Sequence, residues 1–456
     1  MKKFGCFDNS QSGSAMITAL GVLLVMYIFA MGALTISASQ MNVSTQEKKG
    51  NQAFNVAEAG LNKAIWKYNN SVSYGPTASA PDTGTVREGT FEIYVSAGSA
   101  SNQKIITVTS YSPNKTSAKV KRRRIQATVM VTPQILSYGM FTGGWVDGSG
   151  SATAYYPPLD YTAAGARGTD IGSNSQINIQ DQGLDVNPAG ATFNGYFGTG
   201  TGYPVPTGNI VLAGPSASMS SNKGSIVNKA TLTAYASKWN MNDVVILANP
   251  MTYPTFDFDS ASSSSLKSMA AANTANGALN SPTGHNGVYT YAEFNTIMTN
   301  NANLVLTGPI YVDASTNSMT VSKNVTINNG YLCIKSNNAV TNSGGISIAH
   351  STALSKTYPG LVLYSAAGNL SSMTGRGTAT IDGLVYGEKT FDFTRATFTV
   401  KGCLLVVGVT NVASVIMKNG TVILQYDPNV MSTIGFSSTG SQQLTKVLSW
   451  REVPAQ

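Results

Sequence analysis

The chain of 456 residues is short of charge, because Asp, Glu, Lys and Arg together make up only 11% of it. This shortage does not indicate a disordered protein, since apolar residues reach 42% and the net charge is +8, which is small for the length. The same small net charge argues against nucleic acid as a partner. Abundant uncharged polar residues instead favour a β-rich protein that works outside the cell.

Cysteine is also scarce, with three residues in the whole chain. Cys6 lies close to the N-terminus, and no apolar run precedes it, so it is not a lipoprotein site. Cys333 and Cys403 stand within aliphatic strands, where we expect buried free thiols, with a disulfide as the alternative. Strand alternation predicts that both point to the same side as Leu405 and Val407, inward if those two do.

Catalytic and metal-binding motifs are absent from the sequence. It contains no Gly-x-Ser-x-Gly, phosphate loop, His-Glu-x-x-His or Cys-x-x-Cys. The two histidines, His285 and His350, lack metal-ligand spacing. We therefore expect no enzyme, no cofactor and no metal.

One enzyme hypothesis remains, because many proteins of the β-helix type cut polysaccharides with clustered carboxylates. The close set after residue 314 is Asp382, Glu388, Asp392 and Arg395. We interpret these four as surface charges at a loop. Asp257 and Asp259 share a strand face at best, and no third ligand for calcium accompanies them.

The longest stretch without charge runs from Asn9 to Gln46. Within it, Ala15 to Leu34 forms an apolar run of 20 residues. As a helix this run would be ~30 Å long, which is the thickness of the hydrocarbon of a bilayer. Lys2 and Lys3 precede it as cytoplasmic anchors. The pattern predicts one transmembrane helix.

The helical pattern continues beyond the apolar run to Lys67. Its apolar residues recur every three or four positions and so share one face, namely Phe54, Ala57, Leu61, Ile65 and Tyr68. Gly50 and Asn51 interrupt good helix formers and predict a bend. We expect one helix of roughly 55 residues, membrane-embedded in its first half and amphipathic in its second.

A short basic leader that ends at Gly13 precedes the charge-free helix, and the helix carries the block Gln52-Ala-Phe-Asn-Val-Ala-Glu-Ala-Gly-Leu61. This layout resembles the type IV prepilins, and in particular the minor pilins of the PilX type. The resemblance covers about residues 10–70 well and extends more loosely to about residue 132. It implies cleavage after Gly13 by a prepilin peptidase, which leaves Ser14 as the mature N-terminus.

The resemblance further implies that the helix packs among other pilins. The helix residues concerned are Thr18, Phe54, Ala57, Glu58, Gly60, Leu61 and Ile65. Major pilins carry Glu at mature position five, where this chain has Thr18. That departure favours a minor subunit at the tip or at initiation. A single pass through the cytoplasmic membrane would leave most of the chain outside the cytoplasm, on the pilus or cell surface after assembly.

The alternative for the N-terminus is an ordinary signal peptide or a plain membrane anchor. Ser37-Ala-Ser39 offers a small-residue cleavage site. A secretory apolar region is shorter than this one, however, at about 7–15 residues. The Ala-Glu-Ala-Gly block favours the pilin-like interpretation.

The helix is expected to be followed by an α+β unit that closes at residue 133. Residues 71–88 are a polar linker, and alternating patterns predict strands at 91–96, 104–112 and 120–132. These strands would form an antiparallel sheet beneath the helix. The run Lys121–Arg124 is the densest in charge, but alternation along a strand sends its side chains to opposite faces, so a strand end or protected edge is favoured over a phosphate or acidic-partner site.

Residues 134–300 form a Gly-, Ser- and Asn-rich β region with short apolar patches. Residues 301–456 contain a repeat in which a glycine precedes an aliphatic quartet. The repeat glycines are Gly308, Gly330, Gly360, Gly383, Gly402 and Gly420. Spacings near 20 predict the coils of a parallel β-helix, with a Greek-key sandwich as the alternative. Leu448 to Val453 is expected to cap the last coil.

These patterns predict a minor pilin of a type IV pilus or a related filament, with an all-β solenoid that serves assembly or adhesion. The expected partners are other pilins, the prepilin peptidase and the membrane. The alternative function is an anchored or secreted surface adhesin that binds a polysaccharide or another surface ligand.

Overall fold

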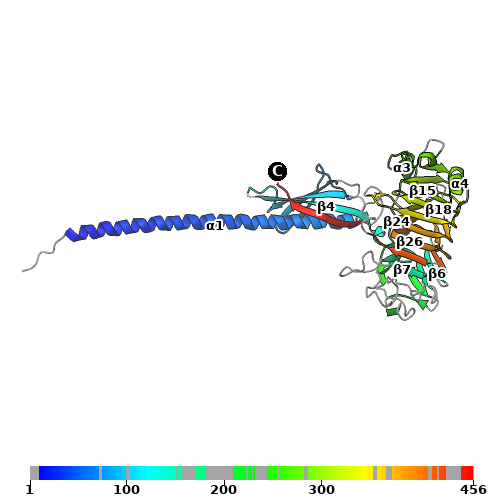
Figure 1. Cartoon of the computed structure of the whole chain (residues 1–456). Helices are drawn as coiled ribbons and strands as arrows, with labels where there is room; N and C mark the ends of the chain where they lie inside the picture. The colour runs from blue at the N-terminus through cyan, green and yellow to red at the C-terminus, as the bar shows by residue number, and fades with distance from the viewer. Residues whose placement is uncertain are drawn as a thin grey trace, which may run out of the picture.

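The computed structural model has three parts in a row: a long helix, a small antiparallel sheet and a parallel β-solenoid (Figure 1). The structure describes residues 10–70, 74–98, 103–118, 120–149, 153–155, 170–179, 209–221, 224–228, 230–231, 244–254, 256–281, 286–352, 357–365, 372–408, 413–418, 421–427 and 443–454. The helix projects from one end of the molecule and the solenoid forms the other end.

Helix α1 spans Ser10–Asn70, or 61 residues. It passes through Gly50 and Asn51 without a break, so the predicted bend is wrong. Gly50 is buried beneath Arg123, and a Cβ added there would lie 3.3 Å from the guanidinium nitrogen Nη2. The helix already rests on the sheet at this point, so tertiary contact offsets the low helix propensity of glycine.

The antiparallel sheet has five strands in the order β1-β2-β3-β4-β29. Their bounds are Asp82–Val86, Gly89–Ala97, Gln103–Ser112, Lys121–Pro133 and Gln443–Glu452. Three of these strands were predicted. β1 lies in the segment predicted to be a linker, and it forms a hairpin with β2.

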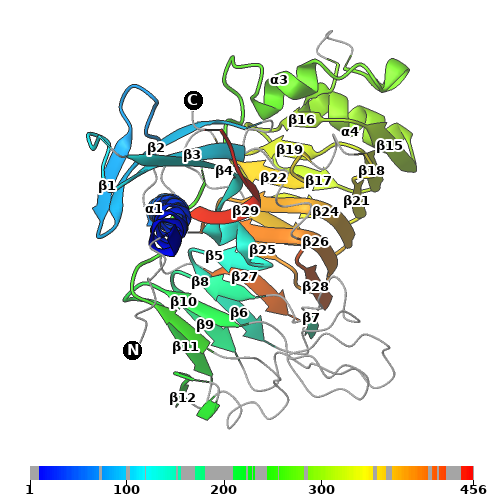
Figure 2. The same ribbon diagram turned by 90° about the vertical axis from the view of Figure 1, so that its left-hand side faces the viewer.

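The fifth strand, β29, corrects the expected role of the C-terminus. It pairs antiparallel with β4, from Gln443 opposite Pro133 to Glu452 opposite Ile125. The C-terminal strand therefore does not cap the last solenoid coil but completes the sheet on which α1 rests (Figure 2). The solenoid is thus an insertion between two neighbouring strands of one sheet.

The solenoid is a parallel β-helix with three faces. The first face contains β15 (Asn303–Thr307), β18 (Asn324–Asn328), β21 (Gly345–Ala349), the first halves of β24 (Thr378–Gly387) and β26 (Thr397–Val406), β28 (Thr421–Gln425) and β7 (Thr153–Tyr155). All these neighbours pair in parallel, which excludes the Greek-key alternative.

The second face runs in the order β13-β10-β8-β5-β26-β24-β22-β19-β16-β14. Its remaining strands are β13 (Val244–Leu247), β10 (Ile210–Ala213), β8 (Ile171–Ser173), β5 (Met140–Thr142), β22 (Leu361–Tyr364), β19 (Leu332–Lys335), β16 (Ile310–Asp313) and β14 (Val288–Thr290). The third face contains β12 (Gly224–Ser225), β11 (Ser218–Ser221), β9 (Gln176–Ile179), β6 (Trp145–Ser149), β27 (Ala413–Lys418), β25 (Thr390–Asp392), β23 (Ser372–Gly375), β20 (Val340–Asn342) and β17 (Met319–Val321).

The order of the coils in space differs from their order in the sequence. The chain enters the solenoid at β5, in the middle of the stack, and winds outward to β13. It then restarts at the opposite end with β14 and winds back until β26 pairs with β5, Leu405 opposite Phe141. The division expected at residue 300 is therefore not structural, because coils from both sides of it share one stack.

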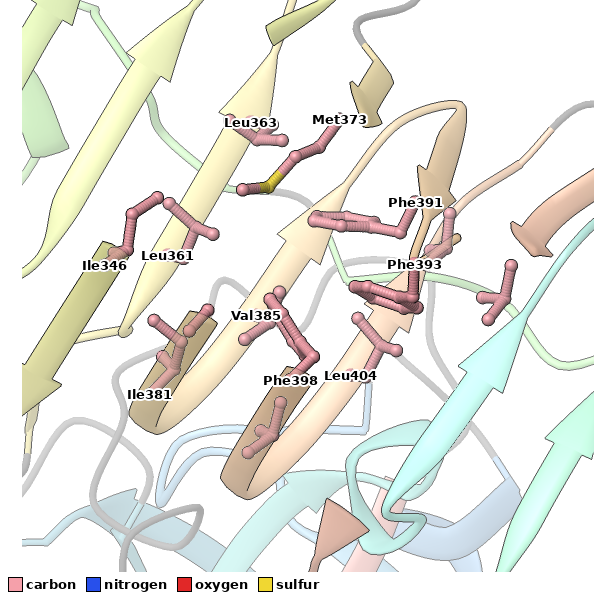
Figure 3. Close-up of a cluster of buried hydrophobic side chains, with 14 of the residues drawn as sticks. Ile346, Leu361, Leu363, Met373, Ile381, Val385, Phe391, Phe393, Phe398 and Leu404 are labelled. Atoms are coloured by element: carbon pink, nitrogen blue, oxygen red, sulfur yellow. The ribbon is translucent and has the colours of Figure 1, made fainter. Parts of the chain in front are cut away.

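The apolar interior of the solenoid holds the stack together. Leucine, isoleucine, valine and phenylalanine side chains from all three faces meet there and are almost fully buried (Figure 3). At one end, helix α4 (Tyr291–Asn300) covers the interior with the buried Phe294 and Met298. A capping box formed by Thr290 and Glu293 fixes the start of α4. This helix provides the cap that was expected from the C-terminal strand.

The repeat glycines stack at one corner of the coils. Gly383 and Gly402 are paired in register, both with positive φ, and a Cβ on Gly402 would lie 2.1 Å from the carbonyl oxygen of Gly383. Only glycine permits so close a backbone approach. Gly420 lies outside the described residues, and the quartet that follows it, Thr421–Leu424, pairs with Thr397–Val400 on the first face.

Residues 248–254 and 256–281, which we call the crossing segment, pass over the outside of the second face and return the chain to the far end of the stack. It includes the short α-helix α3 (Leu266–Ala271) and the 3-10 turn η2 (Gly277–Leu279). Phe258 stacks on Tyr364 at 4.3 Å between ring centroids, and Phe256 meets Tyr386 at 4.8 Å. A second apolar cluster therefore forms between this crossing segment and the outer side of the sheet.

Cys333 and Cys403 lie in this second cluster, and both are buried free thiols, as expected. They share a side with Leu405 and Val407, also as expected. That side faces away from the interior, however, because the alternate residues such as Leu404 and Val406 fill the interior. Burial raises the pKa of both thiols, which keeps them protonated and unreactive.

Candidate functional site

The first half of α1 projects free of the rest of the protein. Every residue from Ala15 to Lys48 is exposed, and the helix contains one segment long and apolar enough to cross a membrane. Ile17 is 76% exposed and Phe29 is 73% exposed. The large apolar side chains that share this exposure are Met16, Ile17, Leu20, Val22, Leu23, Leu24, Val25, Met26, Tyr27, Ile28, Phe29, Met31, Leu34, Ile36, Met41 and Val43. A surface of this size marks a site of interaction.

The second half of α1 is packed on the antiparallel sheet. The helix residues in contact form one stripe, and those buried are Ala53, Val56, Ala57, Gly60, Ala64 and Tyr68. They meet strand residues of β2, β3 and β4, including Phe91, Val108 and Ile125. Phe54, Leu61 and Ile65 are half-buried at the border of the stripe.

Small residues let the helix approach the sheet closely. A Cβ on Gly60 would lie 2.7 Å from Cγ1 of Val108 and 3.0 Å from the ring of Phe91. The sequence pattern predicted the correct side of the helix. It selected mainly the large residues, Phe54, Leu61 and Ile65, which lie at the border of the buried stripe. Ala53, Val56 and Ala64 were missed, although a row of small residues at helical spacing is the signal of a closely packed helix face.

The residues predicted for processing and filament packing do not converge within this chain. Gly13 and Ser14 lie in α1, which begins at Ser10. Thr18 and Glu58 are exposed, whereas Ala57 and Gly60 are buried against the sheet. Only the exposed members of this set are therefore accessible to another subunit.

Polar contacts fix the second half of α1 on the sheet. The Asp82 carboxylate accepts from Lys63 Nζ at 2.9 Å, from Lys67 Nζ at 3.0 Å and from the Tyr74 hydroxyl at 2.9 Å. Burial alone would raise the pKa of Asp82, but these three donors outweigh it and hold the pKa below its ordinary value. Ser110 Oγ donates to the Ala53 carbonyl at 2.6 Å, at the other end of the contact.

The acidic residues that could suggest catalysis have separate local roles. Glu388 accepts from the Ser365 amide at 2.6 Å, and Asp392 accepts from the Thr394 amide and hydroxyl. Asp257 accepts from Ser260 in a turn, and Asp259 pairs with Lys335 at 2.8 Å. Among the described residues, no group of three His, Cys, Asp or Glu side chains could hold a metal ion.

The histidine that the structure describes, His350, has a local structural role. His350 is buried, and its Nε2 lies 2.8 Å from the Gly330 carbonyl. Burial lowers its pKa, so the ring is neutral at physiological pH. His285 lies outside the described residues.

No protein-family model matches this chain, and no curated protein matches it. The crystal structure of the competence-associated pilin ComZ from Thermus thermophilus aligns with 89% of this chain and 97% of its own, with 12% sequence identity and a TM-score of 0.30. At this level of similarity, the fold described above rests on the helix, the sheet and the solenoid of the chain itself.

Proposed function

We propose that this chain is a pilin-like filament subunit. Its helix α1 is embedded in the membrane before assembly, and its solenoid projects away from the membrane. One observation supports this most strongly: α1 is a single unbroken helix whose first half is exposed and carries the apolar run from Ala15 to Leu34, while its second half is fixed to a folded unit. Such a helix suits both a lipid bilayer and a bundle of similar helices.

The exposed half cannot remain in water, because its burial is favourable by ~25 cal/mol for each Å² of apolar surface. Lipid satisfies it before assembly. A filament core made of neighbouring helices satisfies it afterwards, so the transfer between the two costs little. Because α1 continues unbroken through Gly50 onto the sheet, the sheet and solenoid would lie outside that core.

Thr18 supports a finer role as a minor subunit at the tip or at initiation. An unpaired carboxylate at this depth would be costly in lipid, so a subunit with Glu needs a partner there. Thr18 is uncharged and has no such requirement. It suits a position where a neighbouring N-terminus is missing, and low stoichiometry follows from that.

Processing provides the first experiment. Co-expression with a prepilin peptidase should yield a chain that begins at Ser14, and Gly13→Ala should reduce the yield of that product sharply. N-terminal sequencing distinguishes the outcomes. A mature chain beginning at Gln40 would contradict the proposal and support a secreted protein.

Position in the filament requires a second experiment. Immunogold labelling of the solenoid should place this subunit at filament ends, and deletion should reduce filament number without altering the filaments that remain. Gold particles spaced regularly along the whole shaft would exclude the tip or initiation role. They would leave the pilin-like assignment intact.

The adhesin alternative draws support from the first face of the solenoid. The outward positions there form three rows along the coils. One row is Val305, Thr326, Ser347, Thr380, Thr399 and Ile423, and a second is Asn303, Asn324, Gly345, Thr378 and Thr397. These two rows carry no charge, whereas the third includes Asp382 and Lys401. A flat array of hydroxyl groups suits an uncharged polysaccharide. Adsorption of the protein to insoluble polysaccharide, lost on Thr380→Lys with Thr399→Lys, would favour this function.

A further inference from the structure

Basic side chains gather where α1 leaves the antiparallel sheet toward its exposed half. They come from α1, the β1–β2 turn, the loop after β3, and strands β4 and β29. We call this group the basic collar, and its members are Lys48, Lys49, Arg87, Lys115, Lys121, Arg122, Arg123, Arg124 and Arg451. Six of them are exposed, and Lys49, Lys121 and Arg124 are half-buried.

Contacts across the elements place these residues at one end of the sheet. Lys121 Nζ donates to Gln46 Oε1 of α1 at 3.2 Å, and the Arg123 guanidinium lies against Gly50. Ser112 pairs with Lys121 across β3 and β4, and its Oγ donates to the Glu88 carbonyl at 3.0 Å, which brings the turn containing Arg87 to the same end.

Strand β29 brings the last member to the collar. Arg451 lies opposite Gln126, and the neighbouring Glu452 pairs with Arg123 at 2.6 Å. The collar is therefore assembled from residues more than 350 positions apart. No run in the sequence reveals it.

The charge run 121–124 divides between the two faces of the sheet, as alternation requires. Lys121 and Arg123 lie on the helix side, and Arg122 lies over the Tyr111 ring on the other side at 5.8 Å. Both faces reach the same end of the sheet, however, which is the end nearest the exposed half of α1. The run therefore supplies positive charge to that end from both faces. A single surface perpendicular to α1 can contact both halves.

The region of the collar contains more than half of the net positive charge of the protein. Among the described residues, the acidic side chains of the same region are Glu47, Glu88, Glu92 and Glu452. Nine basic groups against these four give an excess of five positive charges, whereas the whole chain has a net charge of +8.

The position of the collar along α1 matches the thickness of a membrane. The charge-free helix from Ser14 to Gln46 would be ~50 Å long at ~1.5 Å per residue. A bilayer with its headgroups is ~40–45 Å thick. With Ser14 at the cytoplasmic surface, the collar lies just beyond the opposite headgroup layer. Its distance from the headgroups is within the Debye length of ~8–10 Å, so salt does not fully screen the attraction between them.

We propose that the basic collar docks on anionic phospholipid headgroups while the subunit is in the membrane. This inference rests on the proposed embedding of α1 and adds a partner for the folded part of the chain. Headgroup phosphates are held by lysine and arginine side chains on both faces of the sheet end. The contact keeps the sheet against the membrane surface until α1 is withdrawn into a filament.

The test uses the full chain in vesicles of phosphatidylcholine, with or without phosphatidylglycerol. A fluorophore is attached at Ala118→Cys, in the exposed loop between β3 and β4, in a Cys6→Ser background. Cys333 and Cys403 are buried and stay unlabelled. Headgroup-labelled lipid quenches the fluorophore when the collar is docked.

Phosphatidylglycerol should increase quenching, and added salt should reverse the increase. The triple change Lys48→Gln, Arg87→Gln and Arg122→Gln should lower the ratio of docked to undocked protein about a hundredfold. The matched control, Lys323→Gln with Arg376→Gln and Lys401→Gln in the solenoid, removes the same charge and should have no effect. The proposal is overturned if quenching does not depend on phosphatidylglycerol. It is also overturned if the collar variant and the solenoid control lose quenching equally.

Three further measurements keep the outcomes separate. Hydrogen exchange of the β3 amides verifies that the triple variant is folded, and the double change Lys48→Gln with Arg87→Gln, away from the central strands, should still give a reduced effect. Collar-dependent binding of duplex DNA without any lipid dependence overturns the proposal in favour of nucleic acid. A chain that does not float with neutral vesicles overturns the proposed function itself.

Discussion

The two halves of α1 have the same backbone and opposite surroundings. From Ala15 to Lys48 every residue is exposed, and from Gly50 to Tyr68 one stripe is buried beneath the sheet. Within the exposed half, the run from Ala15 to Leu34 is apolar on all sides, whereas the packed half is apolar on one side. A helix that is apolar on all sides requires apolar surroundings on all sides, which only a membrane or a helix bundle provides.

The difference extends to the glycines. In the exposed half, a Cβ on Gly21 or Gly32 would meet nothing within 4 Å, whereas on Gly60 it would collide with Val108. Glycine in the packed half therefore serves contact within this chain. Glycine in the exposed half is available for contact with other helices, in the way that small residues permit close packing in membranes.

The largest expected effect comes from a charge in the exposed half. Val25→Asp should disfavour membrane insertion by about 3 kcal/mol, because an aspartate at the centre of a membrane helix is costly. The amount of protein retained in the membrane fraction should fall on the order of a hundredfold. The control Asn55→Asp places the same charge on the exposed side of the packed half and should leave retention unchanged. Equal retention of Val25→Asp would mean that this half does not cross a membrane.

Gly60→Val should destabilise the packing of α1 on the sheet by ~1–3 kcal/mol, because its side chain would overlap Val108 and Phe91. The matched change Gly32→Val has open space around it and should alter stability by less than ~0.5 kcal/mol. Hydrogen exchange of the β3 amides in detergent-solubilised protein measures both. Similar protection in the two variants would contradict the asymmetry of the two halves.

Asp82→Asn should cost ~0.5–1 kcal/mol, because it removes the partly exposed ion pairs with Lys63 and Lys67. The folded-state pKa of Asp82 is lowered, so its contribution is present above the unfolded pKa and is lost as the pH falls through the folded pKa. Protection of β2 and β3 should therefore decrease with acid in the wild type. The variant should show a weaker acid dependence, and an unchanged one would exclude this role of Asp82.

The smallest change in stability is expected from a substitution at Gly50, where the exposed and packed halves of α1 meet. Gly50→Ala gains up to ~1 kcal/mol of helix propensity, but its Cβ approaches the flexible Arg123 guanidinium at 3.3 Å. The guanidinium can move, so we expect a net stabilisation below ~1 kcal/mol by thermal unfolding. A large loss of stability would show that the contact between Arg123 and the helix backbone is rigid.

Several features of the fold could be predicted because their signals are local. Alternation predicted β2, β3 and β4, and the spacing of glycines predicted parallel coils from Gly308 to Gly402. The quartet after Gly420 lies on the first face, because Thr421 pairs with Thr397, whereas the quartets after Gly383 and Gly402 lie on the second face. A glycine indicates a tight backbone, but it does not state which corner of the coil it occupies.

The candidate site was predicted in part. The length and apolar character of the membrane-length run follow from the order of residues 15–34, whereas the stripe centred on Ala53, Val56 and Gly60 depends on how closely the sheet approaches. The direction of Cys333 and Cys403 likewise depended on the crossing segment. A strand with apolar residues on both sides has two covered faces, and alternation cannot tell which of them is the interior.

The local order of residues is enough to specify a long helix with a charge-free first half and the coils of strands that follow it. These properties depend on interactions between residues a few positions apart in the chain, so the local sequence contains the information that specifies them. Three features instead arise from packing between distant segments: Gln443–Glu452 pairs with β4, the coils stack out of sequence order, and Lys48 and Arg451 border the same surface. Each of these depends on surfaces that exist only after distant segments have folded and met, so no local pattern can specify them.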